Sequence, residues 1–232
     1  MSELLPLFPL STVLFPGMRL PLHIFEERYR ALAAHLLTQP EERRQFGVIA
    51  IRRGREVGTD GITALHEVGC VTTVRQMAEH ADGRFDLGTV GTQRFRLLRV
   101  DDSLPYFQGE VELLADEGAP PGDDGQGPRA DELAFATGRV QEGFRAYLNA
   151  LADRGGGVIS IADLPDEPVL LSYVVGAAMI IDLPERQSLL AAPTALDRLR
   201  LERSLLVRET AMLRATTSRP APDYAFQQFS QN

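Results

Sequence analysis

The residue types most often used for chemistry are sparse in this chain, and their spacing forms no catalytic or metal-binding pattern. The histidines are His23, His35, His66 and His80. No two of them stand three or four residues apart, the spacing that would place two ligands on one helix face. The single cysteine, Cys70, excludes an intrachain disulfide and a cysteine-based zinc site. We therefore expect neither a metal ion nor any other cofactor.

Cys70 is also the one candidate for a thiol nucleophile. It begins a predicted strand, Cys70 to Met77, and cysteines buried within a core are usually inert. The chain contains no Gly-x-Ser-x-Gly segment of the kind that presents a serine nucleophile. A core thiol is the favoured interpretation of Cys70, and a hydrolase that uses it as a nucleophile stays as an alternative.

Lysine chemistry is absent altogether, because all 24 basic residues are arginines. A Walker A loop needs its lysine to contact nucleotide phosphates, and a Ser–Lys dyad or a Schiff base needs one as well. Arginine does not replace lysine as a base, since its guanidinium group stays protonated. The sequence therefore predicts a protein that is not an ATPase, not a Ser–Lys peptidase and not an enzyme.

Composition narrows the class of protein further. The chain has 232 residues, 44 % of them hydrophobic, and a net charge of −8, which is typical of a globular protein and disfavours nucleic-acid binding. The prolines within residues 4–16 argue against a signal peptide. The longest apolar run, Val169 to Ile181, is shorter than the about 20 residues that cross a bilayer. We expect a cytoplasmic protein without a membrane segment.

The first half of the chain has the hydrophobic pattern of strands. Short apolar or alternating runs predict that residues 1–114 form a β-rich unit. Its one helix is expected from Ile24 to Leu37, with an apolar stripe formed by Phe25, Tyr29, Leu32 and Leu36. Strands are expected over 85–90 and 94–100, and a change of phase within the second of these predicts a bulge or bend.

The second half has a helical pattern. Residues 115–130 are rich in proline, glycine and aspartate and are expected to form a flexible acidic linker. Residues 131–215 then repeat their apolar positions with the helical period and predict a bundle, with a central buried helix over Val169–Ile181. Residues 216–232 are expected to be a disordered tail. The fold class is therefore α+β, a β-rich unit followed by a helical bundle.

Several segments, taken together and in this order, resemble the LON substrate-binding domain, the N-terminal domain of Lon-type ATP-dependent proteases. They are Leu5-Pro-Leu-Phe-Pro-Leu10, Leu14-Phe-Pro-Gly-Met18, Leu20-Pro-Leu-His-Ile-Phe25, Arg28-Tyr29, Phe46-Gly-Val48, Glu67-Val-Gly69, Asp82-Gly-Arg84, Arg94-Phe95, Pro105-Tyr106, Glu110-Val-Glu112 and Asp182-Leu-Pro184. The resemblance covers residues 4–214 and implies a PUA-like pseudobarrel with one helix, followed by a helical bundle. It also implies recognition of substrate polypeptides. In the full protease an ATPase module and a Ser–Lys peptidase module follow, whereas this chain has no lysine, so we expect a free-standing, non-catalytic relative.

The resemblance predicts a protein that binds exposed apolar segments of unfolded or partly folded clients, with a further role as an adaptor to a separate protease or chaperone. The residues expected to contact a client are Phe15, Pro16, Met18, Leu20 and Ile24. Methionine suits promiscuous contacts, but such residues more often pack the barrel against its helix. The sequence leaves the oligomeric state open.

An RNA-binding PUA-like module is the alternative function. Its motivation is the run of arginines around the strand at Phe46–Ile51, namely Arg43, Arg44, Arg52, Arg53 and Arg55. The other interpretation of these residues is a solvated surface beside neighbouring glutamates, and the acidity of the chain favours it.

Overall fold

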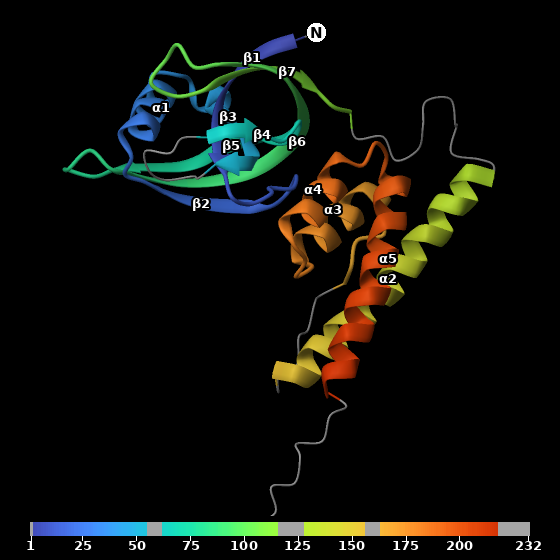
Figure 1. Cartoon of the computed structure of the whole chain (residues 1–232). Coiled ribbons are helices and arrows are strands. Elements are labelled where there is room, and N and C mark those ends of the chain that lie inside the picture. Colours follow the sequence, from blue (N-terminus) through green and yellow to red (C-terminus); the bar gives the residue numbers. More distant parts are fainter. Residues whose placement is uncertain (1, 55–61, 116–127, 156–162, 218–232) are drawn as a thin grey trace, which may run out of the picture.

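A computed structural model describes residues 2–54, 62–115, 128–155 and 163–217 of the chain. Figure 1 shows a β-barrel beside a group of helices. The elements of the first part are β1 (Ser2–Leu10), β2 (Arg19–Ile24), α1 (Glu27–Leu37), η1 (Glu41–Arg43), β3 (Gln45–Gly54), β4 (Ile62–Leu65), β5 (Val68–Glu79), β6 (Phe85–Asp101) and β7 (Gln108–Leu113). The helices of the second part are α2 (Pro128–Gly155), α3 (Pro168–Ala178), α4 (Leu183–Ala191) and α5 (Ala195–Thr217).

The strands close into a ring, which confirms the predicted pseudobarrel. The order is β1-β7-β6-β5-β3, and β1 also pairs with β3 in parallel, which joins the two ends of the path. Closure depends on a change of partner within β1, since Ser2–Pro6 pairs with β7 and Leu7–Leu10 pairs with β3. Each half of β1 thus has one pairing neighbour, which makes its prolines tolerable. Strand β4, which the sequence did not predict, extends the sheet beyond β3.

Strand β6 is longer than predicted and holds much of the barrel together. It runs unbroken over residues 85–101, where two strands were expected, and it pairs with β5 along most of its length. Its first part pairs with β2 and its second part with β7. The register shift between Leu97 and Arg99 confirms the bend that the change of hydrophobic phase predicted.

Helix α1 begins three residues later than expected. Tyr29, Leu32 and Leu36 are buried as predicted, and the Tyr29 ring stacks on Phe8 with 4.0 Å between ring centroids. Ile24 instead ends β2, and Phe25 precedes the helix with 54 % of its surface exposed. The prediction that Phe25 belongs to the buried stripe was therefore wrong, because the helical spacing does not extend to it.

Helix α3 is the central helix of the second part, but it is shorter than predicted. It ends at Ala178, Met179 already has an extended backbone, and Ile180 is 69 % exposed. The core around it is built from residues of α2, α3 and α5, including Val140, Phe144 and Leu206. Helices α2 and α5 pack side by side along its flank, as Figure 1 shows.

The predicted division of the chain falls partly outside the described residues. Strand β7 ends at Leu113, and α2 begins at Pro128, three residues before the expected start of the bundle at residue 131. Helix α5 continues to Thr217, one residue past the expected start of the tail. Residues 116–127 and 218–232, on which most of the linker and tail predictions fall, are not among those described.

Buried contacts join the barrel to the helices. Arg94 of β6 is 1 % exposed, and its guanidinium donates hydrogen bonds to the backbone carbonyls of Leu190 (3.0 Å) and Ala192 (2.6 Å) at the C-terminal end of α4. A helix C-terminus attracts a cation because its last carbonyls lack partners within the helix. The Gln187 amide likewise donates to the carbonyl of Val68 across the junction, at 2.9 Å. These contacts fix the barrel and the helices relative to each other.

Candidate functional site

Two of the five predicted binding residues lie in the core. Phe15 is 0 % exposed and packs at the junction, with 6.4 Å between its ring and that of Tyr173 of α3. Ile24 is 2 % exposed and belongs to the barrel core. The structure therefore gives these two side chains a packing role, and neither has surface available to a partner in this conformation.

The other three predicted residues, Pro16, Met18 and Leu20, are partly exposed. Residues 15–18 form a turn in which the Met18 amide donates to the Phe15 carbonyl at 3.1 Å, and Gly17 has a φ of 81°. Two backbone hydrogen bonds with Gly91 hold this turn against β6. Met18 packs on both the barrel core and the junction. The turn therefore fixes where β2 begins.

Strand β2 presents one face to the core and the other to solvent. Leu20 and Leu22 point inward, whereas Arg19, Pro21 and His23 are exposed, as expected for alternating side chains in a strand. Within the described part of the chain, β2 pairs with β6 alone. Its second edge therefore has backbone groups that no other strand of the sheet uses.

Two shallow grooves follow this exposed face across β2, β6 and β5. Their volumes are about 480 and 450 Å³, and both are lined by Pro21, Gln76 and Gly88. These three residues form one row across the sheet, because Gly88 pairs with Pro21 on one side and Gln76 on the other. Gly88 has no side chain to fill the row, so the grooves meet above it. Met77 and Ala78 add apolar surface to the first groove.

A polar cluster closes one end of the first groove. Asp86 of β6 binds two imidazole rings, His23 at 2.6 Å and His80 at 2.7 Å. These hydrogen bonds lower the pKa of the Asp86 carboxyl from its ordinary value. Within residues 2–54, 62–115, 128–155 and 163–217, no three His, Cys, Asp or Glu side chains are arranged to hold a metal ion. The cluster thus links β2 to the β5–β6 hairpin. It was not predicted from the sequence, because His23 is far along the chain from His80 and Asp86.

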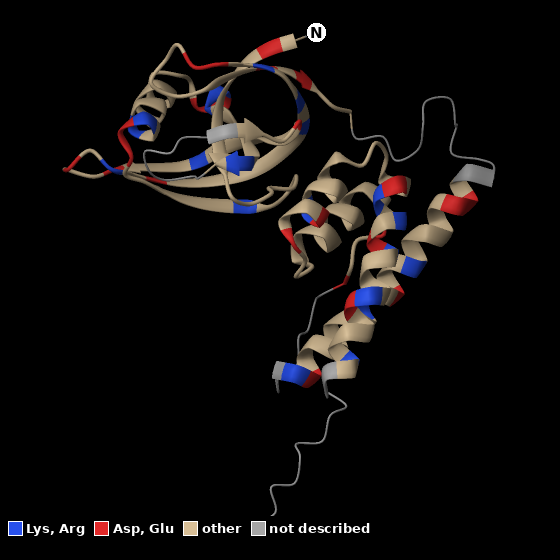
Figure 2. Cartoon of the chain, in the orientation of Figure 1, with Lys and Arg blue, Asp and Glu red and all other residues tan. Residues whose placement is uncertain are grey.

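The arginines behind the alternative function do not come together. Arg44 lies just before β3, and Arg52 lies near the other end of that strand. At about 3.3 Å per residue, the eight residues from Arg44 to Arg52 span about 26 Å. Arg44 also contacts Glu41 (3.8 Å) and donates to the carbonyl of Gln39. Figure 2 shows acidic and basic residues interspersed over the barrel rather than a continuous basic face. Arg55 lies outside the described residues.

Cys70 is a core residue, as favoured from the sequence. It is 0 % exposed, forms no disulfide and packs within the largest barrel cluster, beside Leu14 and Val48. None of the described helices is both long enough and apolar enough to cross a membrane.

The structure is a closed barrel joined to a helical bundle, with two grooves on the outer face of the barrel. Comparison with known proteins identifies its family. The sequence model of the family described as ATP-dependent protease La (LON) substrate-binding domain matches residues 4–208, and the chain belongs to that family.

Individual relatives agree with this assignment. The chain is 28 % identical to Lon protease 2 of Syntrophobacter fumaroxidans over 83 % of its own length and 26 % identical to Lon protease of Escherichia coli over 90 %. It spans 23 % and 25 % of those two proteins. Among solved structures it is similar to a Lon N-terminal domain protein from Xanthomonas campestris (25 % identity, TM-score 0.56, 88 % of this chain and 98 % of that one). The N-terminal domain of Mycobacterium avium complex Lon protease has the same fold (17 % identity, TM-score 0.62, 90 % and 98 % covered).

Proposed function

We propose that this protein binds exposed apolar segments of unfolded or partly folded polypeptides, without catalysis, on the outer face of β2, β6 and β5. The observation that carries the proposal is the pair of grooves that meet above Gly88 in a chain of the LON substrate-binding family. Pro21, Met77 and Ala78 give the first groove its apolar surface. The unpaired edge of β2 offers backbone groups that an extended peptide could match.

The proposal revises the predicted contact residues. Met18 and Leu20 are partly exposed next to the grooved face, but Leu20 points inward and neither residue lines a groove, so they stay at the margin of the proposed surface with Pro16. Phe15 and Ile24 act as anchors that hold the segment between them. Because the grooves are shallow and open, binding to any one client segment should be weak. A role as an adaptor would require a separate protease or chaperone to engage the same chain.

The test is binding of the purified protein to a chemically unfolded, labelled model protein, at low and at high salt. Ala78→Asp places a charge in the groove at an exposed position, so folding should be preserved. Ala134→Asp is the matched control, because Ala134 is exposed on α2 and lines neither groove. We expect binding that resists salt, that weakens about tenfold or more with Ala78→Asp, and that the control leaves unchanged.

Single-stranded RNA serves as the competing ligand. Binding to phosphates would weaken steeply as salt increases, and Arg52→Glu together with Arg53→Glu would abolish it. RNA binding with that behaviour, in the absence of binding to the unfolded protein, would overturn the polypeptide proposal. Equal loss of client binding in Ala78→Asp and Ala134→Asp would show that the groove is not the binding site.

A further inference from the structure

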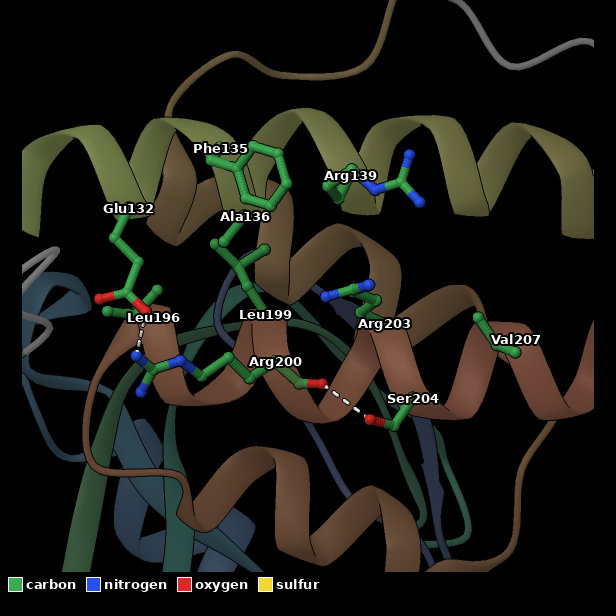
Figure 3. Close-up of a pocket in the computed structure, with 10 residues that line it drawn as sticks. All are labelled: Glu132, Phe135, Ala136, Arg139, Leu196, Leu199, Arg200, Arg203, Ser204 and Val207. Carbon is green, nitrogen blue, oxygen red and sulfur yellow. Dashed lines mark hydrogen bonds and ion pairs between the residues drawn. The ribbon is translucent and has the colours of Figure 1, made fainter.

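A third groove lies far from β2, between the helices α2 and α5. These helices run in the same direction, because Glu132 pairs with Arg200 near one end and Gly143 lies against Leu206 further along. The groove between them has a volume of about 480 Å³. In Figure 3 the side chains of both helices border it, with α2 above and α5 below.

The groove has an apolar floor and apolar walls that no part of the described chain covers. Leu199 forms the buried floor at 0 % exposure, whereas Phe135 on α2 is 64 % exposed and Val207 on α5 is 66 % exposed. Ala136 and Ser204 are small side chains that let another backbone approach closely. Helix α3 already packs on the other side of α2 and α5. Two parallel helices with one open apolar face provide the groove that an amphipathic helix fills.

The charge of the groove differs in sign from that of the chain. Its lining residues include three arginines and one glutamate, a net charge of +2, on a protein whose total is −8. Arg139 and Arg200 have partners at the rim, which are Glu142 at 2.9 Å for the former and both Glu132 and Asp197 (3.4 Å) for the latter. Arg203 lies between the two helices in Figure 3 and has no ion-pair partner within the described residues. The carboxylates of a ligand would therefore be complementary in charge to Arg203.

We propose that this groove docks an acidic amphipathic helix of a partner protein. The apolar stripe of that helix would cover Phe135 and Val207, and its carboxylates would reach Arg203 and Arg139. This interaction is separate from client binding on the barrel, because it requires a helical, acidic ligand and uses none of the residues of the β2 face. It gives the protein a means to hold one folded partner while the barrel engages an extended segment.

The probe is a synthetic 18-residue helical peptide, labelled with fluorescein, with leucines on one face and glutamates beside them. The comparison peptide has lysine at each glutamate position. Binding to the full chain is followed by fluorescence anisotropy. The groove variants are Arg203→Glu and Val207→Asp. The matched controls are Arg145→Glu and Met212→Asp, which change exposed residues on the same two helices outside the groove.

We expect the glutamate peptide to bind and the lysine peptide to bind at least tenfold more weakly. Arg203→Glu and Val207→Asp should each weaken the glutamate peptide tenfold or more, with less than a twofold change in the controls, and circular dichroism should show all variants folded. Binding of the unfolded client protein should be unaffected by Val207→Asp, so failure here is distinguishable from failure on the barrel.

Three outcomes would overturn the proposal. The two peptides could bind equally, or Arg145→Glu could weaken binding as much as Arg203→Glu. Either result would show that the charge of the groove does not contribute to recognition of the peptide. Sedimentation could also show that the wild-type chain self-associates and that Val207→Asp makes it monomeric. The occupant of the groove would then be a second copy of this chain rather than an acidic partner helix.

Discussion

The carboxyl group of Glu202 is buried at the centre of the helical part and makes a strong prediction about pH. Glu202 is 0 % exposed, and neither carboxyl oxygen has a hydrogen-bond partner in the described residues. Burial raises its pKa well above the ordinary value. The charge of Arg198 opposes this shift, and so does the Gly176 backbone amide, which makes no well-formed hydrogen bond to either oxygen. The folded protein therefore keeps a proton on Glu202 where an unfolded chain would release it.

This proton determines the sign of the effect. Between the pKa of a free glutamate, about 4.3, and the raised pKa of Glu202, the folded state binds more protons than the unfolded state. The free energy of unfolding then falls as pH increases, by at most about 1.4 kcal/mol per pH unit. In Glu202→Gln the side chain has nearly the same shape and no proton to lose. Between pH 5 and pH 7 the variant should therefore gain up to about 2.7 kcal/mol relative to wild type.

Urea unfolding at several pH values between 5 and 7, followed by circular dichroism, measures this difference directly. Glu142→Gln, at an exposed position of α2, is the control, and its effect should stay within about 0.5 kcal/mol at every pH. If the difference in stability between wild type and Glu202→Gln instead stays constant from pH 5 to pH 7, Glu202 is already ionised in the folded state and paired with Arg198. That result would refute the reasoning from burial.

Three further perturbations test the junction, the turn and the polar cluster. Arg94→Met should lower the free energy of unfolding by about 3 kcal/mol, because it leaves carbonyls at the end of α4 without their charged donor. Arg96→Met, at an exposed position two residues further along, should lower it by less than about 0.5 kcal/mol. Equal losses of stability in thermal or urea unfolding would contradict the role of Arg94 at the junction. Gly91→Ala should destabilise the fold by about 1–3 kcal/mol, since its new Cβ would lie 2.5 Å from the backbone oxygen of Phe15. Gly138→Ala, where a Cβ meets nothing within 4 Å, should instead stabilise α2 by about 0.5–1 kcal/mol. Carbon-13 NMR titration should find the pKa of Asp86 below its ordinary value, and closer to that value in a variant with His23 and His80 both changed to Ala. The stability that these hydrogen bonds provide is present at neutral pH and is lost as pH falls through the pKa of Asp86. An unchanged pKa of Asp86 in the double variant would show that the two histidines do not lower it.

Local patterns in the sequence predicted the elements well, because each pattern depends on neighbours along the chain. The spacing of Tyr29, Leu32 and Leu36 placed α1, and the change of phase near Leu97 predicted the bend in β6. The ring closure of β1 against β3 was expected only from family resemblance. No local pattern specifies a parallel pairing between residues about 40 positions apart.

The candidate site was harder to predict, because exposure depends on what packs against each face. Phe15 and Met18 look equally suited to a surface patch in the sequence, yet α3 covers one and leaves the other partly open. The grooves depend on the row formed by Pro21, Gly88 and Gln76, which three different strands contribute. The alternation of Arg19, Pro21 and His23 with leucines was the one local signal of an exposed face at β2.

The burial of Phe15 and Ile24 changes how a binding experiment on this segment must be interpreted. The two residues anchor the ends of the segment, one in the junction and the other in the barrel core. Between them the outer face of β2 has little freedom to move, which reduces the entropy lost when a peptide is bound. A charged substitution at either anchor would disturb the fold and the surface together, so loss of client binding in Phe15→Asp would not distinguish contact from packing. Ala78→Asp changes an exposed groove position that is neither of the two anchors, and it therefore separates the two effects.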